Sequence, residues 1–302
     1  HAEASFQGAL AYARERRSMR AVTGKKEPDA NADALIWHAD VRRMLLTQKA
    51  IAEGGRAMIY AAAQTADLMV DAGRRQDRAT QDKHDDTLGF YTPILKGFLT
   101  EMGLEAANLG MQVFGGHGYI HEHGMEQIAR DARIATLYEG TTGIQALDLL
   151  GRKVLLGTRG KCVRDFSRIM LRSARTHWLA HGSIGRMARS TVKRAIEWNL
   201  LTLRIMRRVG KDRDLVGSAS VDYLMYSGYV MMAHFWVRQA AVAQTFLRNG
   251  KGAESAEFYR AKIQTAEFYF DRLLPRADAH RKSALAPTRS LMQMGNGDFA
   301  FS

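Results

Sequence analysis

Apolar residues recur at helical spacing through most of the first half of the chain. Near the start, Phe6 and Leu10 are spaced for one face of a helix. The same period predicts further helices over about 41–73, 93–113 and 144–156. No Ser, Thr or Asp stands before the first helix to cap it, so we expect the chain to be a piece of a longer protein.

Proline and glycine set the expected ends of these helices. Pro93 is expected in the first turn of its helix, where a proline needs no amide partner. The run Gly115–Gly118 is expected to end the same helix. Thr141 or Thr142 can cap the helix that follows, because a hydroxyl accepts a hydrogen bond from a free amide of the first turn. Four main helices of this kind are typical of an antiparallel bundle.

The spacing of apolar residues in the second half of the chain predicts another set of long helices. Residues 151–160 are rich in glycine and are expected to form a linker. Residues 223–237 contain no Asp, Glu, Lys or Arg, but a membrane span needs about 20 residues, so we expect a buried core helix. The fold class is therefore all-α, a four-helix bundle domain over 1–155 followed by a second helical bundle domain over 156–302. Its helices are expected at about 161–180, 184–209, 218–248 and 253–273, before a weakly structured tail over 290–302.

Composition narrows the class of protein. The chain has 302 residues, of which 46% are hydrophobic and 25% charged, a globular balance. Only 4 prolines argue against a turn-rich β-sandwich. The single cysteine, Cys162, excludes an internal disulfide framework and fits a reducing compartment. No charged segment leads into an apolar run at the start, so we expect a cytoplasmic or mitochondrial matrix protein that is not secreted.

Charge is distributed unevenly between the two halves. Residues 1–150 carry 17 Lys and Arg against 20 Asp and Glu, whereas residues 151–302 carry 27 against 11. The net charge of +13 therefore comes from the second half. In this half, cations at helical spacing form two stripes. The stripes are either a solvated helix face or a site for an acidic protein or an anionic membrane surface, and nucleic acid is not expected as a partner. The stripes are formed by Arg164, Arg168, Arg172 and Arg175, and by Arg204, Arg207, Arg208 and Lys211.

Two segments can carry chemistry. The adjacent Gly115 and Gly116 leave backbone amides open to an anion such as a phosphate, although a pair of glycines more often only ends a helix. Glu139 stands just before a helix start, where the helix dipole favours a carboxylate. Its small and aromatic neighbours would also allow it to be desolvated and to act as a general base.

Three histidines lie close together at His117, His121 and His123. They stand in a glycine-rich segment without a cysteine or an acidic cluster at ligand spacing, so surface histidines are favoured over a metal site. No phosphate-binding loop or dinucleotide fingerprint of the common kinds is present in the sequence.

Taken together, the motifs resemble the C-terminal helical domain of acyl-CoA dehydrogenases. The resemblance covers residues 1 to about 155, and the motifs follow one another in the family's order and spacing. The sequence around Val41 and Thr142 is similar to that of a longer branch of the family. This branch includes enzymes that act on methylmercaptopropionyl-CoA and on fatty acyl-CoAs, and its members have an additional C-terminal helical domain. The motifs are Arg14-Glu-Arg-Arg, Gln112-Val-Phe-Gly-Gly-His-Gly-Tyr, Arg130-Asp-Ala-Arg-Ile and Tyr138-Glu-Gly-Thr.

The resemblance implies FAD-dependent oxidation of an acyl-CoA to the trans-2-enoyl-CoA. Glu139 would remove the α-proton, while Tyr138 and Gly140 would line the site of the thioester. The thioester oxygen would need hydrogen bonds as enolate character develops, and in the family one comes from the backbone N–H of this glutamate. Thr141 would lie at the FAD of its own subunit.

The resemblance also implies assembly. Arg16 would contact an FAD phosphate across a subunit interface, and Gln112, Gly115 and Gly116 would hold the adenine dinucleotide of a neighbouring subunit. A homodimer or homotetramer is therefore implied, with electron-transferring flavoprotein as the acceptor of electrons. The family's N-terminal helical domain and β-domain are not in this sequence and would lie on the same or another chain.

The sequence departs from the family pattern at three positions. Met19 replaces an aromatic residue, Arg20 replaces a glycine, and Gly143 stands where a glutamine is common. These departures affect the expected FAD contacts. The alternative hypothesis is therefore a helical interaction or membrane-associating module that uses the fold without its own catalysis.

Overall fold

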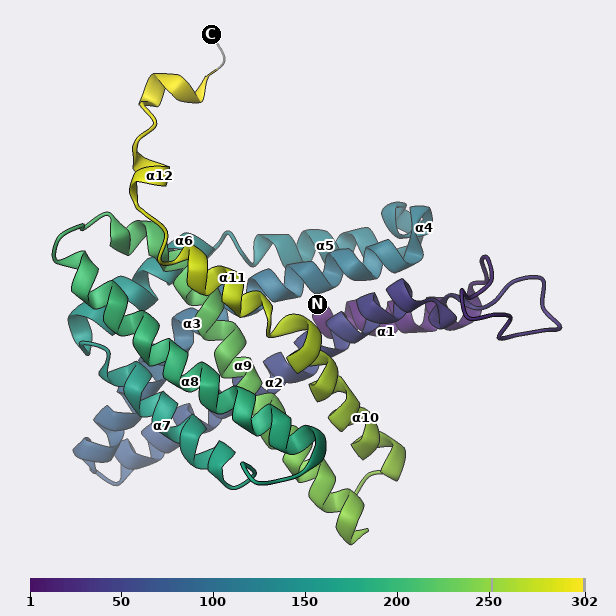
Figure 1. Cartoon of the computed structure of the whole chain (residues 1–302), viewed down its shortest axis with the longest axis horizontal. Coiled ribbons are helices and arrows are strands. Elements are labelled where there is room, and N and C mark those ends of the chain that lie inside the picture. Colours follow the sequence, from purple (N-terminus) through teal and green to yellow (C-terminus); the bar gives the residue numbers. More distant parts are fainter. Residues whose placement is uncertain (251, 301–302) are drawn as a thin grey trace.

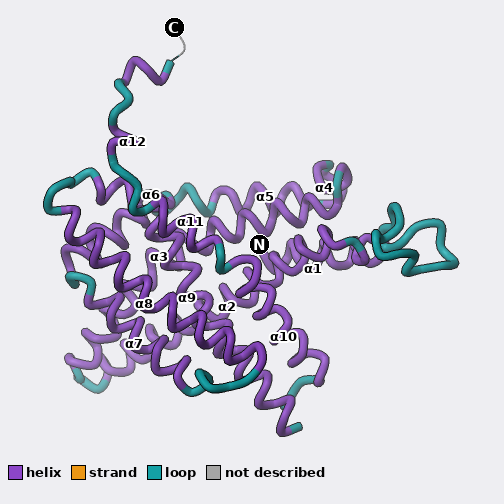
Figure 2. Tube along the Cα trace, viewed as in Figure 1, coloured by secondary structure: helices purple, strands orange, loops and turns teal. Residues whose placement is uncertain are grey.

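The computed structural model describes residues 1–250 and 252–300. In these residues the regular structure is helical throughout, and they contain no strand, which confirms the all-α prediction (Figure 2). None of the helices in this part of the chain is long and apolar enough to cross a membrane.

The helices of the first half form an elongated group. Two of them, α2 and α3, are long antiparallel neighbours, and α1 and α5 pack along them (Figure 1). The helices are α1 (Ala2–Glu15), α2 (Ala39–Arg74), α3 (Arg78–Phe114), α4 (Gly116–Tyr119), α5 (Met125–Ile134) and α6 (Thr142–Leu147), with 3-10 turns η1 (Leu35–Trp37) and η2 (His121–His123).

Helix α3 begins earlier than predicted. Its N-cap is Asp77, whose side chain accepts a hydrogen bond from the amide of Thr80, and the helix then continues through Pro93. The prediction that Pro93 opens the helix is therefore wrong. A proline in a helix interior removes one backbone hydrogen bond, but Pro93 is buried at the centre of the protein, where packing outweighs this cost.

The predicted linker at 151–160 is also wrong over most of its length. Helix α6 continues without a break into a π-helix, η3 (Asp148–Gly157), and only residues 158–160 form a turn. Leu149, Leu150 and Val154 of η3 are fully buried, and this burial explains why glycines at 151 and 157 do not open the chain.

Most of the remaining helices form the body of the molecule, in the lower part of Figure 1. The remaining helices are α7 (Lys161–Arg175), α8 (Gly182–Val209), α9 (Leu215–Asn249), α10 (Ala256–Phe268), the π-helix η4 (Tyr269–Leu273), α11 (Arg276–Ser283), α12 (Arg289–Met292) and the 3-10 turn η5 (Asn296–Phe299). The tail that was expected to be weakly structured holds only the short helices α12 and η5 and extends away from the body.

Helix α9 is the core helix of the whole chain. Every residue of 223–237 is buried, which confirms the prediction for this segment. Helix α9 packs against α8, α10 and α11 from its own half and against α2, α3 and α6 from the other. The indole of Trp236 donates a hydrogen bond to the carbonyl of Ala50 in α2 over 3.3 Å.

One apolar core therefore runs through both halves of the chain, and a smaller core lies between α1, α2 and the end of α3. At the crossing of α3 and α9, a glycine on each helix meets a large residue of the other. A Cβ at Gly228 would lie 2.1 Å from the ring of Phe98, and one at Gly97 would lie 2.5 Å from Leu224. The division into domains at 155/156 stays a prediction.

Candidate functional site

The predicted site residues fall into two groups at opposite ends of α5. Arg16, Gln112, Gly115 and Gly116 lie where α1 and α3 end, near α4, and Tyr138–Thr141 form the turn between α5 and α6 (Figure 1). Helix α5 has 10 residues, so its length alone puts about 15 Å between the two groups.

The first group lines a single groove of about 450 Å³. The floor beside these four residues is aromatic, because Tyr12 stacks on Phe114 with ring centroids 4.1 Å apart. The groove therefore offers an apolar floor, a cation and bare backbone in one place. Its lining is Tyr12, Arg16, Ser18, Leu35, Val41, Met44, Gln112, Val113, Phe114, Gly115, Gly116 and His117.

The two glycines leave open space at the groove. Gly115 has φ +60°, and no heavy atom lies within 4 Å of a Cβ built at Gly115 or Gly116. Gly118 differs, because its Cβ would lie 2.3 Å from the carbonyl oxygen of Met111. Gly118 is thus required for packing. The amide of Gly115 donates to the carbonyl of Gln112 over 3.0 Å, so the expectation that both glycine amides are open to an anion is wrong for Gly115, and within the described residues the amide of Gly116 is the one left for a ligand.

Arg16 provides the positive charge of this groove. It is exposed at the end of α1, and within the described residues its guanidinium has no carboxylate partner. A diphosphate is the kind of group that an unpaired arginine beside open backbone can hold.

Arg20, a departure from the family pattern, has a structural partner. It donates to the carboxylate of Asp33, which is fully buried and also accepts from the amides of Ala21, Lys26 and Glu27. These hydrogen bonds, led by that of the Ala21 amide, hold the pKa of Asp33 well below its usual range. Arg20 therefore helps to fix the loop that follows Arg16.

The second group is a strained turn. Glu139 has φ +52°, a left-handed conformation that costs a residue with a side chain about 1–2 kcal/mol. Gly140 follows with φ +90°, and the Gln145 side chain donates to the carbonyl of Glu139 over 3.2 Å. Thr141 caps α6 by accepting from the amide of Ile144, which confirms the predicted cap.

The functional groups of Glu139 remain free in this turn. Among the described residues, neither its carboxylate nor its backbone N–H has a hydrogen-bond partner. Tyr138 beside it is half exposed, with the ammonium of Lys96 5.1 Å from the centre of its ring. A free carboxylate and a free amide on one fixed residue can act on a proton and on a carbonyl oxygen of the same bound molecule.

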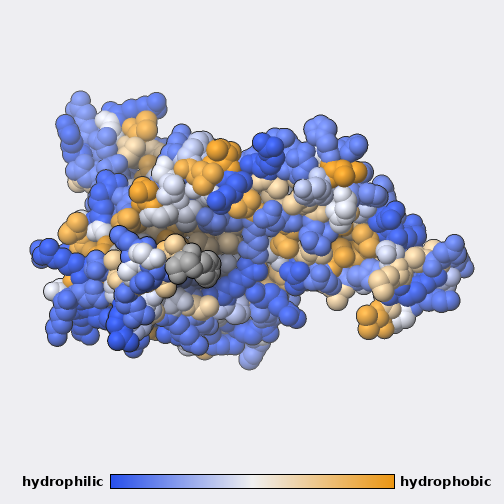
Figure 3. All heavy atoms as spheres, turned by 90° about the horizontal axis from the view of Figure 1, so that it is seen from above, coloured by the Kyte–Doolittle hydropathy of each residue, from blue (hydrophilic) through white to orange (hydrophobic). Residues whose placement is uncertain are grey.

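Exposed apolar side chains surround the turn. Ile134, Leu137, Ile144 and Leu147 are 42–56% exposed. Figure 3, a view of the molecule from above, shows apolar side chains interspersed among polar ones at the surface. A bound molecule or another protein surface that covers them would remove water from Glu139.

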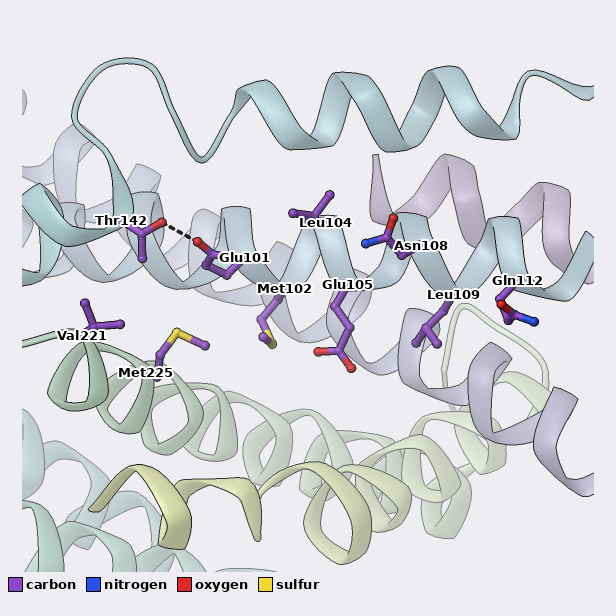
Figure 4. A pocket seen from close by; sticks show the side chains of 10 residues that line it. All are labelled: Glu101, Met102, Leu104, Glu105, Asn108, Leu109, Gln112, Thr142, Val221 and Met225. Carbon is purple, nitrogen blue, oxygen red and sulfur yellow. Dashed lines mark hydrogen bonds between the residues drawn. The ribbon is translucent and has the colours of Figure 1, made fainter. Parts of the chain in front are cut away.

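A second groove, of about 720 Å³, runs along α3 from Thr142 to Gln112 (Figure 4). Its opposite wall comes from Val221 and Met225 of α9. Thr142 donates to Glu101 over 2.5 Å at one end. No motif in the sequence predicted this groove, although Glu101, Glu105, Asn108 and Gln112 stand at helical spacing along one face of α3.

The histidines near α4 pair with other side chains. His117 hydrogen-bonds the hydroxyl of Tyr12 over 2.8 Å, and His121 contacts Glu126. In the part of the chain that the structure describes, no three His, Cys, Asp or Glu side chains are arranged to hold a metal ion.

Solved structures share this helical architecture. An acyl-CoA dehydrogenase from Bacillus anthracis complexed with FAD matches 99% of this chain and 47% of its own, with a TM-score of 0.69 and 15% identity. ACDH-11 of Caenorhabditis elegans in complex with C11-CoA matches 93% of this chain and 45% of its own, with a TM-score of 0.68 and 16% identity. The fold is thus that of the helical part of acyl-CoA dehydrogenases.

Sequence comparison assigns the family. The model for the acyl-CoA dehydrogenase C-terminal domain matches residues 1–155, and the model described as acetyl-CoA dehydrogenase C-terminal like matches residues 167–295. The chain therefore belongs to the acyl-CoA dehydrogenase family.

Curated relatives agree with this assignment. A 3-methylmercaptopropionyl-CoA dehydrogenase of Ruegeria pomeroyi is 36% identical over 92% of this chain and 45% of its own length. A broad-specificity linear acyl-CoA dehydrogenase of Mycobacterium tuberculosis is 28% identical over 97% of this chain and 48% of its own. The chain spans about half the length of these relatives.

Proposed function

We propose that this chain contributes to FAD-dependent α,β-dehydrogenation of an acyl-CoA thioester to the trans-2-enoyl-CoA. Glu139 is the catalytic base in this proposal. One observation carries it, the left-handed conformation of Glu139 with its carboxylate and amide both unpartnered in the described part of the chain. Strain of this kind is kept where it serves a function.

The side chain and the backbone amide of Glu139 have separate roles at the thioester. The carboxylate of Glu139 takes the α-proton, and its backbone N–H donates to the thioester oxygen, which gains negative charge as the proton leaves. Tyr138 and Gly140 line the thioester site. The surrounding apolar side chains exclude water from the turn once they are covered.

FAD fits the residues of the groove at Arg16. Gly115 and Gly116 keep open space for its diphosphate, Arg16 supplies the charge, and Gln112 and the aromatic floor suit the adenine part. Bound FAD accepts the hydride that the β-carbon loses. Thr141 lies with Glu139 at the far end of α5, and we propose that it contacts the FAD of its own subunit.

The separation of the two groups of residues supports an FAD that is bound between two subunits. Glu139 and the groove lie beyond opposite ends of α5, which is about 15 Å long, so we propose that the groove serves the FAD of a neighbouring subunit in a homodimer or homotetramer. The N-terminal and β-domains of the family, on the same or another chain, would complete the acyl site. Electron-transferring flavoprotein is the proposed acceptor, and the cytoplasm or mitochondrial matrix is the proposed compartment.

Flavin bleaching by an acyl-CoA tests the assignment of Glu139. In flavin-loaded protein, Glu139→Gln keeps the size of the side chain but removes its basicity. We expect retained flavin and loss of bleaching by at least a hundredfold in rate. The control is Glu122→Gln, an exposed glutamate of η2, which should bleach at the parental rate.

Two results would contradict the proposal. Undiminished bleaching in Glu139→Gln removes Glu139 from its role. Parental protein that binds FAD but is not bleached by any acyl-CoA favours the alternative, an interaction module that uses the fold without catalysis.

A further inference from the structure

The hairpin of α7 and α8 has a strong excess of positive charge. Residues 161–209 carry 12 Lys and Arg but only two acidic residues, Asp165 and Glu197. Both acids are already paired within the hairpin, Asp165 with Lys161 and Arg168, and Glu197 with Arg194 and Lys193. The remaining cations therefore have almost no counter-charge in the hairpin itself.

These cations lie on the outer side of the molecule. Helices α7 and α8 pack against each other, with α9 beneath them, at the edge of the body (Figure 1). Their buried residues, including Arg194, face this interior, and most of the other cations stand on the exposed faces. The exposed cations are Lys161, Arg164, Arg168, Arg172 and Arg175 on α7 and Arg186, Arg189, Lys193, Arg204 and Arg207 on α8.

Large apolar side chains are exposed among the same cations. On α8, Ile196, Leu200 and Leu203 lie between Lys193 and Arg204 and are 40–50% exposed. Binding of a polyanion alone would not bury these apolar side chains, because their burial requires an apolar partner.

The loop that joins the two helices has the same character. Trp178 is 41% exposed and Leu179 is 86% exposed, and Arg175 ends the helix just before them. Arg189 of α8 donates to the carbonyl of Trp178 over 3.0 Å, which fixes the loop against the helix. An exposed Trp and Leu beside arginines match the boundary between lipid headgroups and acyl chains.

We propose that the α7–α8 hairpin is a docking surface for a bilayer that contains anionic phospholipid. The arginines and lysines contact the headgroups, and the Trp178–Leu179 loop and the apolar stripe of α8 enter the boundary region. This surface is independent of the catalytic proposal, because none of its residues belongs to the site at Glu139 or the groove at Arg16.

Vesicle binding tests both parts of this surface. We expect the protein to co-sediment with vesicles of phosphatidylcholine and phosphatidylglycerol, but not with vesicles of phosphatidylcholine alone. Each arginine near an anionic surface contributes about fivefold in affinity, so Arg172→Gln with Arg175→Gln should weaken binding about 30-fold. The matched control is Arg14→Gln with Arg42→Gln, two exposed arginines of α1 and α2, which should bind like the parent.

The apolar contribution has its own readout. Trp178 emission should shift to shorter wavelength on binding. Trp178→Phe should abolish this shift, because Trp198 and Trp236 are already fully buried and the exposed Trp37 lies in η1, outside the hairpin. Trp178→Ser with Leu179→Ser should weaken binding at least tenfold, whereas Val22→Ser with Ile59→Ser, an exposed apolar pair elsewhere, should not.

Three outcomes would overturn the proposal. Equal binding to neutral vesicles removes the charge argument. Parental binding by the Trp178 and Leu179 variant removes the insertion argument. Binding to a single-stranded RNA with a similar loss in the arginine variant, but none to vesicles, would make the hairpin a polyanion surface instead. Flavin bleaching should be unchanged in every hairpin variant, which separates this test from that of Glu139.

Discussion

The close crossing of α3 and α9 makes a sharp prediction about stability. Gly228 of α9 lies against Phe98 of α3, a fully buried ring, and a Cβ at Gly228 would lie 2.1 Å from it. Real Cβ contacts are essentially never shorter than 3.0 Å, so the ring or the helix must move by about 1 Å. Gly228→Ala therefore overpacks the shared core.

The size of the effect follows from two opposing contributions. Overpacking a buried site costs about 1–3 kcal/mol. Alanine in place of glycine inside a helix gains up to about 1 kcal/mol from helix propensity. Gly103→Ala, in the interior of α3, makes the same change with no heavy atom within 4 Å of the new Cβ, so it should show the gain alone. We expect Gly228→Ala to be less stable than Gly103→Ala by about 1–3 kcal/mol.

Urea unfolding followed by circular dichroism measures this difference. In thermal unfolding, the midpoints of the two variants should differ by about 1.5–2 °C for each kcal/mol. The comparison between the two variants cancels the propensity gain and leaves the packing cost. Equal stability of Gly228→Ala and Gly103→Ala would refute the reasoning, because α3 and α9 would then not be in close contact, and the two halves would not share a core at this crossing.

Three further predictions concern individual side chains. Gly116→Val adds a side chain in the open space of the groove at Arg16 and should lower the FAD content per protein without changing the unfolding midpoint; unchanged FAD content would exclude the groove from the cofactor site. Asp278→Ala removes both hydrogen bonds that buried Arg194 donates to it and should cost about 1–3 kcal/mol in urea unfolding at neutral pH. Because the Arg194 hydrogen bond lowers the pKa of Asp278, this contribution is present above the unfolded pKa of about 3.9 and lost as pH falls through the lower folded pKa, so an undiminished difference in strong acid would contradict it. Burial raises the pKa of the Cys162 thiol, so a disulfide reagent should label folded protein much more slowly than urea-unfolded protein at mildly alkaline pH, and equal rates would contradict its burial.

Local signals predicted the helices well where a single residue decides the boundary. The Thr141 cap follows from a hydroxyl before an apolar run, and the buried segment 223–237 follows from its lack of charge. Pro93 and the glycines at 151 and 157 misled the prediction for a common reason. Their local preference is to end a helix, but burial of residues such as Leu150 and Val154 outweighs about 1 kcal/mol per glycine.

The candidate site could be predicted only in part. The motif order indicates which residues belong to it, but their division between two ends of α5 requires the folded chain. The strain at Glu139 and the free amide depend on Gln145, whose contact with the Glu139 carbonyl has no signal in the sequence. The groove along α3 also needs Val221 and Met225, which come from the other half of the chain.

The shared core has a consequence for how the protein is made. Helix α3 ends at residue 114 and α9 begins at residue 215, so about 100 residues must be added before α3 can pack against α9. At 5–20 residues per second this takes about 5–20 s. During this time Ile94, Phe98 and other core residues of α3 are not yet buried by α9. The nascent chain should therefore depend on chaperones that bind apolar segments, and the turn at Glu139, complete in sequence early, should reach its final geometry late.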